Sequence, residues 1–362
     1  MTIRLLFVLV LVLVPFIAMS NSSNVTCSSS DGSGCCDICT TSPCHMTFSS
    51  DVNSISYFSF WQCSALASVT IPSSVTFIGI YAFAKCTSLT SVTIPDSITF
   101  LSDRVFNQCT SLTSVTIPTS VTNIGYGAFD GCTSLTEVNI PSSVTVIQNT
   151  AFQSCTALTT VTIPTSVDSI SDDTFRSCIS LTSATIPASV TSIGAGAFAD
   201  SSLTSVVIPS SVTVIHNSAF QSCKSLTSVT ILPGLTTIRS NAFNSCSKLT
   251  SIIIPSSVTS IEGSAFAWCL SLKSVTIPDS VTSIGDRVFT GSAIACINWD
   301  SSISRSIGPD AFPTSNVCKT VPSIAPTAKA PIRTTRKPTR KPRKRYIYRT
   351  HSPSKSKKNQ LN

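Results

Sequence analysis

A phrase of about 23 residues recurs from Cys63 to Phe312, and this repetition constrains the fold more than any other feature of the chain. Each copy reads approximately C-x-x-L-x-x-V-x-I-P-x-S-V-T-x-I-G-x-x-A-F. A unit this short cannot bury its apolar side alone, so a hydrophobic core forms only when neighbouring units stack. The sequence therefore predicts a repeat solenoid.

A phenylalanine marks the register of the repeat. It recurs at Phe60, Phe83, Phe106, Phe129, Phe152, Phe175, Phe198, Phe220, Phe243, Phe266, Phe289 and Phe312. The spacing is 23 residues except between Phe198 and Phe220, where it is 22. We expect the missing residue to fall in a turn, in the unit where Asp200 replaces the recurrent cysteine. The terminal units depart from the pattern, as capping units do.

Within each unit, leucine, valine and isoleucine follow the cysteine at offsets of three, six and eight residues. This spacing predicts a short strand with its apolar residues pointing inward, and β-branched residues favour that conformation. Proline then ends the strand, because it cannot donate to a ladder. The next segment, S-V-T-x-I-G, predicts a short strand on the return side. We expect strands stacked at about 4.8 Å and little helix.

The repeat resembles the leucine-rich repeats of the BspA-like, or treponemal, subclass, whose pattern is approximately L-x-x-V-x-I-P-x-S-V-T-x-I-G-x-x-A-F-x-x-C. The match covers about 265 of the 362 residues. The resemblance implies a leucine-rich repeat solenoid with a parallel β-strand ladder, on extracellular or cell-surface proteins that act in adhesion and recognition. It implies no shared ligand. We place this solenoid at residues 47–318, with an N-terminal half-repeat, about eleven repeats and a degenerate C-terminal cap at residues 292–318.

The first 20 residues read as a secretory signal peptide. Arg4 precedes an apolar run from Leu5 to Ala18, and small residues follow. The run is shorter than the roughly 20 apolar residues of a membrane-spanning helix, so we favour a cleaved signal over a retained anchor. Asn21 and Asn24 then lie in glycosylation motifs. The sequence predicts a secreted or surface-associated protein.

Nine of the 16 cysteines recur once per repeat. They are Cys63, Cys86, Cys109, Cys132, Cys155, Cys178, Cys223, Cys246 and Cys269. Stacked in phase, their Cα atoms would lie close enough for disulfides, although buried thiols also pack as small apolar groups. We favour a mostly reduced, packed column, because each thiol has equivalent neighbours on both sides.

A second group of cysteines lies in residues 21–46, which we interpret as an N-terminal cap. It contains Cys27, Cys35, Cys36, Cys39 and Cys44. With His45 these cysteines could suggest zinc, but a secreted chain favours disulfides. Since five is odd, one thiol is free, pairs with the repeat column or joins another chain. Cys296 and Cys318 bracket the last degenerate unit and predict a second cap disulfide.

No catalytic constellation is evident in the sequence, and we expect neither an enzyme nor a cofactor or metal. His45, His216 and His351 lie in the cap, a return-side loop and the tail, so they are not expected to meet. A serine nucleophile needs an oriented base beside it. Asp172 and Asp173 form the one paired carboxylate of the repeats, and we interpret them as solvated loop charges.

The outward positions of the longer strands, which we expect to form a concave face, are the predicted binding surface. They carry Thr70, Thr93, Thr116, Glu137, Asn139, Thr162, Thr185, Thr230, Lys273 and Thr276. Few aromatic or charged anchors of the kind that dominate protein interfaces interrupt these hydroxyl ranks. Regular hydroxyls suit a glycan or another repetitive polymer, or they serve only as good β-formers that keep the stack soluble.

Residues 319–362 form a basic tail rich in proline, threonine and lysine, which we expect to be disordered. From Lys329 onward it carries 13 of the 24 basic residues and no acid, whereas residues 1–328 carry 11 bases and 16 acids. Its densest part contains Arg336, Lys337, Arg340, Lys341, Arg343, Lys344 and Arg345. In a secreted chain we expect this tail to bind an anionic polymer, wall or mineral surface rather than nucleic acid, or to act as a passive linker.

Overall fold

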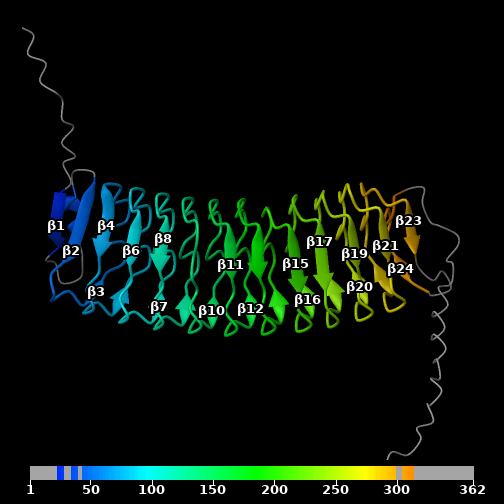
Figure 1. Cartoon of the computed structure of the whole chain (residues 1–362), viewed down its shortest axis with the longest axis horizontal. Helices are drawn as coiled ribbons and strands as arrows, with labels where there is room; N and C mark the ends of the chain where they lie inside the picture. Colours follow the sequence, from blue (N-terminus) through cyan, green and yellow to red (C-terminus); the bar gives the residue numbers. More distant parts are fainter. Residues whose placement is uncertain (1–22, 28–33, 40–42, 299–303, 314–362) are drawn as a thin grey trace, which may run out of the picture. The chain divides into compact units, whose positions relative to one another are not determined.

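The computed structural model describes residues 23–27, 34–39, 43–298 and 304–313. These residues form a parallel-stranded β-solenoid of about 12 turns with almost no helix, which confirms the predicted fold class. Among them the helical content is one 3-10 helix, η1 (Cys35–Ile38). Most coils hold a longer strand, a proline turn and a short return strand, and the coils lie side by side in one row (Figure 1).

The longer strands pair in parallel, one coil with the next. They are β1 (Ser23–Cys27), β2 (Cys44–Phe48), β4 (Leu66–Thr70), β6 (Ser91–Thr93), β8 (Ser114–Thr116), β11 (Thr160–Thr162), β13 (Ser183–Thr185), β15 (Ser205–Ile208), β17 (Ser228–Ile231), β19 (Ser251–Ile253), β21 (Ser274–Thr276) and β23 (Cys296–Asn298). Equivalent residues face one another, as Thr70, Thr93 and Thr116 do.

The return strands form a second, parallel ladder. They are β3 (Ser54–Ile55), β5 (Phe77–Ile78), β7 (Phe100–Leu101), β9 (Asn123–Ile124), β10 (Val146–Ile147), β12 (Ser169–Ile170), β14 (Ser192–Ile193), β16 (Val214–Ile215), β18 (Thr237–Ile238), β20 (Ser260–Ile261), β22 (Ser283–Ile284) and β24 (Ser306–Ile307). Each is two residues long, and the isoleucine or leucine side chain of all but the last points into the core.

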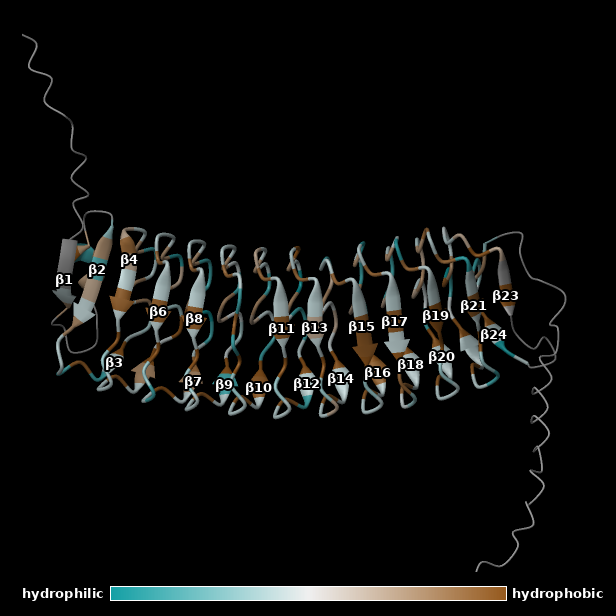
Figure 2. Cartoon of the chain, viewed as in Figure 1, coloured by the Kyte–Doolittle hydropathy of each residue, from teal (hydrophilic) through white to brown (hydrophobic). Residues whose placement is uncertain are grey.

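Strand alternation separates the core from the surface. In β6, Val92 is buried while Ser91 and Thr93 are exposed, as expected for side chains that alternate across a strand. Figure 2 shows the same separation along the chain, with hydrophobic and hydrophilic residues interleaved within each coil. The core is therefore a continuous apolar column enclosed by the two ladders.

The recurrent phenylalanines form a stack along the centre of this column. From Phe60 to Phe312, successive ring centroids lie 4.9 to 5.7 Å apart and the ring planes differ by at most 16°. All of these rings except that of Phe312 are fully buried. Each coil thus covers the ring of its neighbour, which explains why one unit has no core of its own.

The column of cysteines lies beside the phenylalanine stack. Eight of them, Cys86 to Cys269, are free and buried. Each thiol donates to the phenylalanine carbonyl of the preceding coil, as Cys109 Sγ does to Phe83 O at 3.0 Å. The thiols therefore act as weak donors that also fill apolar space.

The shortened unit departs from the sequence expectation. Ser201, rather than Asp200, occupies the cysteine position, because its backbone N–H donates to Phe198 O as Cys178 N–H does to Phe175 O. The Ser201 hydroxyl is buried and lies 3.3 Å from Cys223 Sγ. Asp200 instead adopts a left-handed φ of 59°, like Ser177 and Ser222 at the equivalent turn positions. The prediction that Asp200 replaces the recurrent cysteine was therefore wrong. The residue missing from this unit falls after Ser201.

Hydroxyl groups at the turns also join one coil to the next. Thr113 Oγ1 donates to Thr90 O at 3.1 Å, and Ser120 Oγ donates to Ile98 O at 2.6 Å. Equivalent bonds recur in most coils. Much of the serine and threonine content is thus structural, since these hydroxyls add hydrogen bonds between neighbouring coils.

The N-terminal cap extends the sheet of longer strands. Strand β1 pairs with β2, which pairs with β4 and runs across the boundary that we placed between residues 46 and 47. Three disulfides hold this region, Cys27–Cys35, Cys39–Cys44 and Cys36–Cys63. The fifth cap thiol thus pairs with the first cysteine of the repeat column, and Cys63 does not belong to the reduced set.

The buried stack predicts a large loss of stability on truncation of one ring. Phe175→Ala should lower the free energy of unfolding by about 3 to 5 kcal/mol, because the neighbouring rings lose contacts and a cavity remains. Ile253→Thr is the matched control, since Ile253 is 79% exposed and threonine stands at most equivalent positions. Thermal or denaturant unfolding of the two variants measures the difference. Equal stabilities would contradict the placement of the ring in the core.

Candidate functional site

The outward residues of the longer strands form a continuous surface, which we call the strand face. All ten residues predicted for the binding surface are exposed there, in strands β4 to β21 or directly beside them. Among the described residues, the hydroxyls of Thr70, Thr93, Thr116, Thr162, Thr185, Thr230 and Thr276 make no side-chain hydrogen bond, unlike the turn hydroxyls. These groups therefore retain their full capacity to bond a ligand.

The ladder of longer strands is interrupted at one coil in the N-terminal half. Between β8 and β11, residues Glu137 to Asn139 form no strand, and only the Thr116–Asn139 bridge remains. The start of the coil stays attached through Thr136 N–H, which donates to Thr113 O at 3.3 Å. Val138 is only partly buried, whereas Val115 and Val161 are buried in the flanking coils. The coil therefore recedes from the regular ladder.

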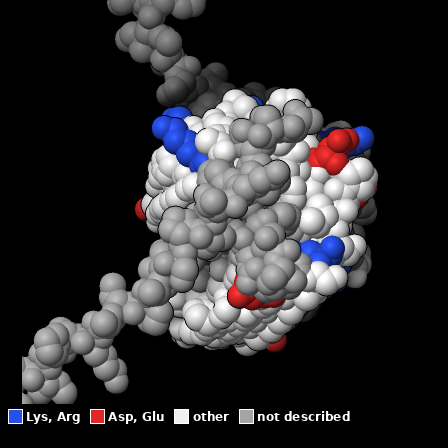
Figure 3. All heavy atoms as spheres, turned by 90° about the vertical axis from the view of Figure 1, so that its right-hand side faces the viewer, with Lys and Arg blue, Asp and Glu red and all other residues white. Residues whose placement is uncertain are grey.

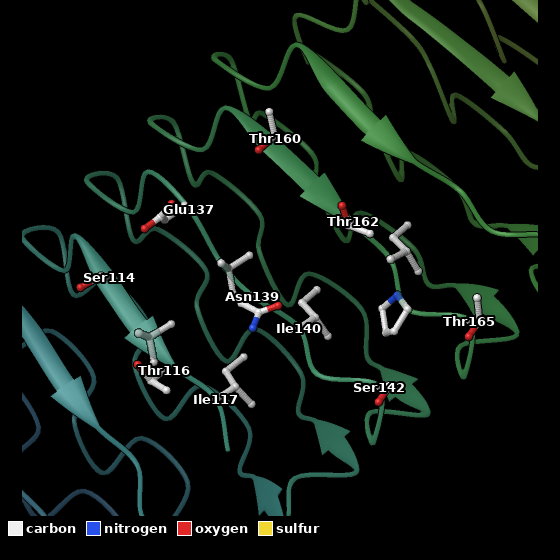
Figure 4. A pocket seen from close by; sticks show the side chains of 14 residues that line it. Ser114, Thr116, Ile117, Glu137, Asn139, Ile140, Ser142, Thr160, Thr162 and Thr165 are labelled. Atoms are coloured by element: carbon white, nitrogen blue, oxygen red, sulfur yellow. The ribbon is translucent and has the colours of Figure 1, made fainter. Parts of the chain in front are cut away.

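A groove opens at this interruption. It has a volume of about 690 Å³ and is lined by residues of the three coils from Ser114 to Thr165. Figure 4 shows Glu137 and Asn139 on a coil without a strand, between the strands that carry Thr116 and Thr162. One carboxylate and one amide thus lie among hydroxyl groups. This set can accept and donate several hydrogen bonds, and we call it the Glu137 groove.

The same face is more apolar in the C-terminal half. Val207 and Ile253 stand in the threonine column and are exposed there, with Thr230 between them. A second break in the ladder, between β13 and β15, lies beside the shortened unit. The strand face therefore has a polar N-terminal part and a partly apolar C-terminal part.

Charged side chains are sparse on the solenoid. Figure 3, which looks from the end where β23 and β24 lie, shows mostly uncharged atoms with a few scattered Lys, Arg, Asp and Glu residues. Asp172 Oδ1 accepts from the Ala195 N–H at 2.6 Å, and Asp173 pairs with Arg176 at 3.1 Å. Asp172 thus joins its coil to the next one, whereas Asp173 is paired within its own turn.

The structure brings no histidine to a shared site within the residues it describes. His45 lies in β2, where its Nδ1 is 2.7 Å from Ser68 Oγ, while His216 follows β16 on the return side. Over the described ranges, no cluster of three or more His, Cys, Asp or Glu side chains is placed to hold a metal ion.

Several predicted site residues lie outside the described part of the chain. These are Asn21, Cys318 and the basic residues Arg336 to Arg345. Asn24 and Cys296 lie in strands β1 and β23, but their side chains are not described. Glycosylation, the second cap disulfide and polyanion binding by the tail therefore stay predictions.

The fold places the chain in the class of leucine-rich repeat solenoids. The sequence model of the BspA type leucine rich repeat region matches in 6 copies, over residues 38–159, 147–269 and 236–323. The chain therefore belongs to the BspA-type leucine-rich repeat family. This family and this fold are those of repeat proteins rather than enzymes.

The chain is similar to solved structures of bacterial proteins, and the first two of those that follow share the fold. A leucine-rich repeat protein from Bacteroides ovatus is 30% identical over 75% of this chain and 84% of that chain, with a TM-score of 0.54. One from Eubacterium ventriosum is 25% identical over 78% and 85%, with a TM-score of 0.53. A leucine rich cell surface protein from Faecalibacterium prausnitzii is 32% identical over 70% and 74%, with a TM-score of 0.45. No curated protein matches the sequence.

The buried thiols predict an alkaline loss of stability. Burial raises the pKa of Cys178, Cys223 and Cys269 from 9.0 to about 12. Between these pH values the unfolded chain loses thiol protons and the folded chain does not, so the free energy of unfolding falls as pH rises. The fall is about 1.4 kcal/mol per pH unit for each thiol. Melting measured from pH 8 to pH 11 should show a shallower decline in Cys178→Ala than in the unaltered chain. Identical slopes would contradict burial of this thiol.

Proposed function

We propose that this chain is a secreted or cell-surface binding protein that acts in adhesion, and that its strand face recognises an extracellular protein or glycan. Membership of the BspA-type family supports a protein-binding or adhesion role. The signal-like N-terminus and the disulfides of the N-terminal cap support an oxidising, extracellular location. No helix among the described residues is long and apolar enough to cross a bilayer.

The Glu137 groove is the observation that carries this proposal. Elsewhere the strand face mostly repeats hydroxyl groups along a regular ladder, apart from the exposed Val207 and Ile253. At the groove a hollow coincides with the two polar departures from the repeat, Glu137 and Asn139. Binding sites in folded proteins combine concavity with a few well-placed polar groups. Binding is therefore centred on this groove.

An extended polar partner fits the groove and its surroundings. Free threonine hydroxyls continue from the groove along the face to Thr93 and Thr70 on one side and to Thr185 on the other. A glycan chain or an extended peptide presents hydrogen-bonding groups at regular intervals and can bond several coils at once. Such repeated weak contacts add up along a solenoid.

The basic tail tethers the protein to an anionic polymer, wall or mineral surface in this proposal. Its 13 positive charges stand on a chain whose first 328 residues carry more acids than bases. The attraction of a polycation to a polyanion is long-ranged at low ionic strength and is screened by salt. The tail therefore holds the solenoid near a surface while the strand face recognises its partner.

The second candidate is a structural component of a cell wall or matrix without a specific ligand. The uniform threonine and serine ranks favour it, because regular hydroxyls also keep a β-stack soluble. Saturable binding that a soluble competitor displaces would favour the binding protein. Release from the wall only by strong denaturants or by mineral dissolution would favour the structural component.

A double substitution in the groove tests the binding proposal. Glu137→Ser with Asn139→Thr restores the residues of the neighbouring coils and should weaken binding to glycans or matrix proteins on an array by about tenfold or more, since it removes hydrogen bonds to a charged and an amide group. Ser274→Thr with Thr276→Ser, on the same face but beyond the stretch from Thr70 to Thr185, is the control. Equal binding by both variants would show that the groove is not the site.

Neutralising the tail tests the tether separately. Glutamine should replace Arg336, Lys337, Arg340, Lys341, Arg343, Lys344 and Arg345, which keeps the length of the chain. Binding to polygalacturonate or to isolated wall material should fall strongly at low salt, and should differ little from that of the unaltered protein at about 1 M salt, where the Debye length is about 3 Å. Unchanged low-salt binding would leave the tail as a passive linker.

A further inference from the structure

Exposed aromatic rings gather on the return side of the first four coils. Tyr57, Phe58, Trp61, Phe100 and Tyr126 are between 36% and 58% exposed, and Tyr81 lies half-buried among them. We call these six residues the aromatic patch. They lie on and beside the return strands β3, β5, β7 and β9, away from the strand face.

The rings form an ordered arrangement along the solenoid. Phe58 stacks on Tyr81 with their centroids 5.0 Å apart, and the Arg104 guanidinium carbon lies 5.3 Å from the Tyr81 ring centroid and 4.9 Å from that of Tyr126. Arg104 also donates a hydrogen bond to the Tyr81 hydroxyl. Lys85 Nζ lies 5.7 Å from the centroid of Trp61. The patch thus combines aromatic surface with two cations at intervals of about one coil.

The repeat itself does not require these rings. From residue 127 to residue 267 the aromatic residues are those of the buried stack alone. The positions equivalent to Tyr81 are Thr150, Ser218 and Asn241 in later coils, and those coils fold in the same way. The patch is therefore a local addition to the scaffold.

The backbone at three of these positions adopts a conformation that bulky residues disfavour. Phe58, Tyr81 and Arg104 have φ values of 60°, 58° and 53°, in the left-handed region that bulky residues disfavour. Gly127 and Gly196 occupy equivalent turn positions without that strain. The same turn is left-handed in every coil, and in the coils from Gly127 to Ser264 it holds Gly, Thr, Asp, Ser or Asn, so bulky residues there distinguish the first coils from these later ones.

The scaffold holds the patch in place before any ligand arrives. Tyr81 N–H donates to Asp103 O at 3.2 Å, and Arg104 N–H donates to Tyr126 O at 2.7 Å. The Cys36–Cys63 disulfide lies two residues from Trp61. Rigid aromatic anchors lose little conformational entropy on binding.

The cations indicate the charge of the partner. Among the described residues the ion pairs are Arg176–Asp173 and Arg305–Asp279, so neither Lys85 nor Arg104 is neutralised by one. Asp103 accepts from the Tyr126 N–H, and Asp130, whose carboxyl group interacts electrostatically with Arg104, accepts from the Asn107 amide. A partner with apolar faces and carboxylates at regular intervals complements this surface.

We propose that the aromatic patch binds an acidic polysaccharide of the polyuronate class. The C–H faces of its sugar rings would pack on Tyr57, Trp61 and Phe100, while Lys85 and Arg104 bind its carboxylates through charge-assisted hydrogen bonds. A polymer with one carboxylate per sugar also suits groups that repeat once per coil. This site is separate from the Glu137 groove, and the proposal does not rest on the function assigned to that groove.

A matched pair of tryptophan variants of the full-length protein tests this proposal. Short oligogalacturonates should bind Trp61→Ala about tenfold more weakly than Trp268→Ala by titration calorimetry. Trp268 is 54% exposed and also lies on a turn, in a coil far along the solenoid, so it controls for loss of a surface tryptophan. Both variants keep the basic tail, so binding through the tail alone would give equal affinities and overturn the proposal.

A charge variant separates the two parts of the site. Arg104→Gln should lose affinity for the oligogalacturonate while its weak binding of the fully methyl-esterified oligomer, which lacks the carboxylate charge, stays unchanged. Melting curves of all variants should match, since the substituted side chains are at the surface. If Trp61→Ala abolished self-association of the chain and left uronate affinity intact, the patch would be a contact between copies of the protein, and the proposal would be wrong.

Discussion

Contact between one coil and the next is the interaction on which the rest of this structure depends. Each buried phenylalanine ring is covered by the rings of its neighbours about 5 Å away, and cysteine thiols and turn hydroxyls donate to carbonyls of the preceding coil. Because no unit has a core of its own, stability accumulates along the row. The end coils lack a neighbouring coil on one side. At the N-terminal end the disulfide-bonded strands β1 and β2 take the place of that neighbour.

Because stability comes from contacts between coils, the outward positions are free to vary. The core and the inter-coil hydrogen bonds use inward and turn residues, so changes on the strand face or the return face cost little stability. Two clusters of departures from the repeat, the Glu137 groove and the aromatic patch, lie within the first half of the solenoid. In the second half, single residues such as Val207, Ile253 and Lys273 interrupt the hydroxyl ranks. Departures from the repeat therefore point to function more directly than the repeat does.

Reasoning from the sequence located the exposed strand-face residues and singled out Glu137 and Asn139 as exceptions, but it did not show that their coil recedes to form a groove. That outcome depends on a partly buried Val138 and on the lost pairing between β8 and β11. The aromatic patch was missed because its members are scattered from Tyr57 to Tyr126 at irregular offsets. A comparison of equivalent repeat positions for bulky residues in place of Gly, Ser, Thr, Asn or Asp would have revealed two of its members, Phe58 and Tyr81.

Periodicity alone determined the solenoid, the inward residues and the buried phenylalanine stack, because a fixed repeat permits only one way to bury its apolar side. It left open which cap thiol pairs with the repeat column, and it placed the missing residue of the shortened unit one position too early. Only the tertiary structure decided these points, showing Cys36 bonded to Cys63 and Ser201 in the cysteine position. The reason is geometric: pairing and turn register depend on which atoms meet when coils stack, and sequence spacing does not contain that information.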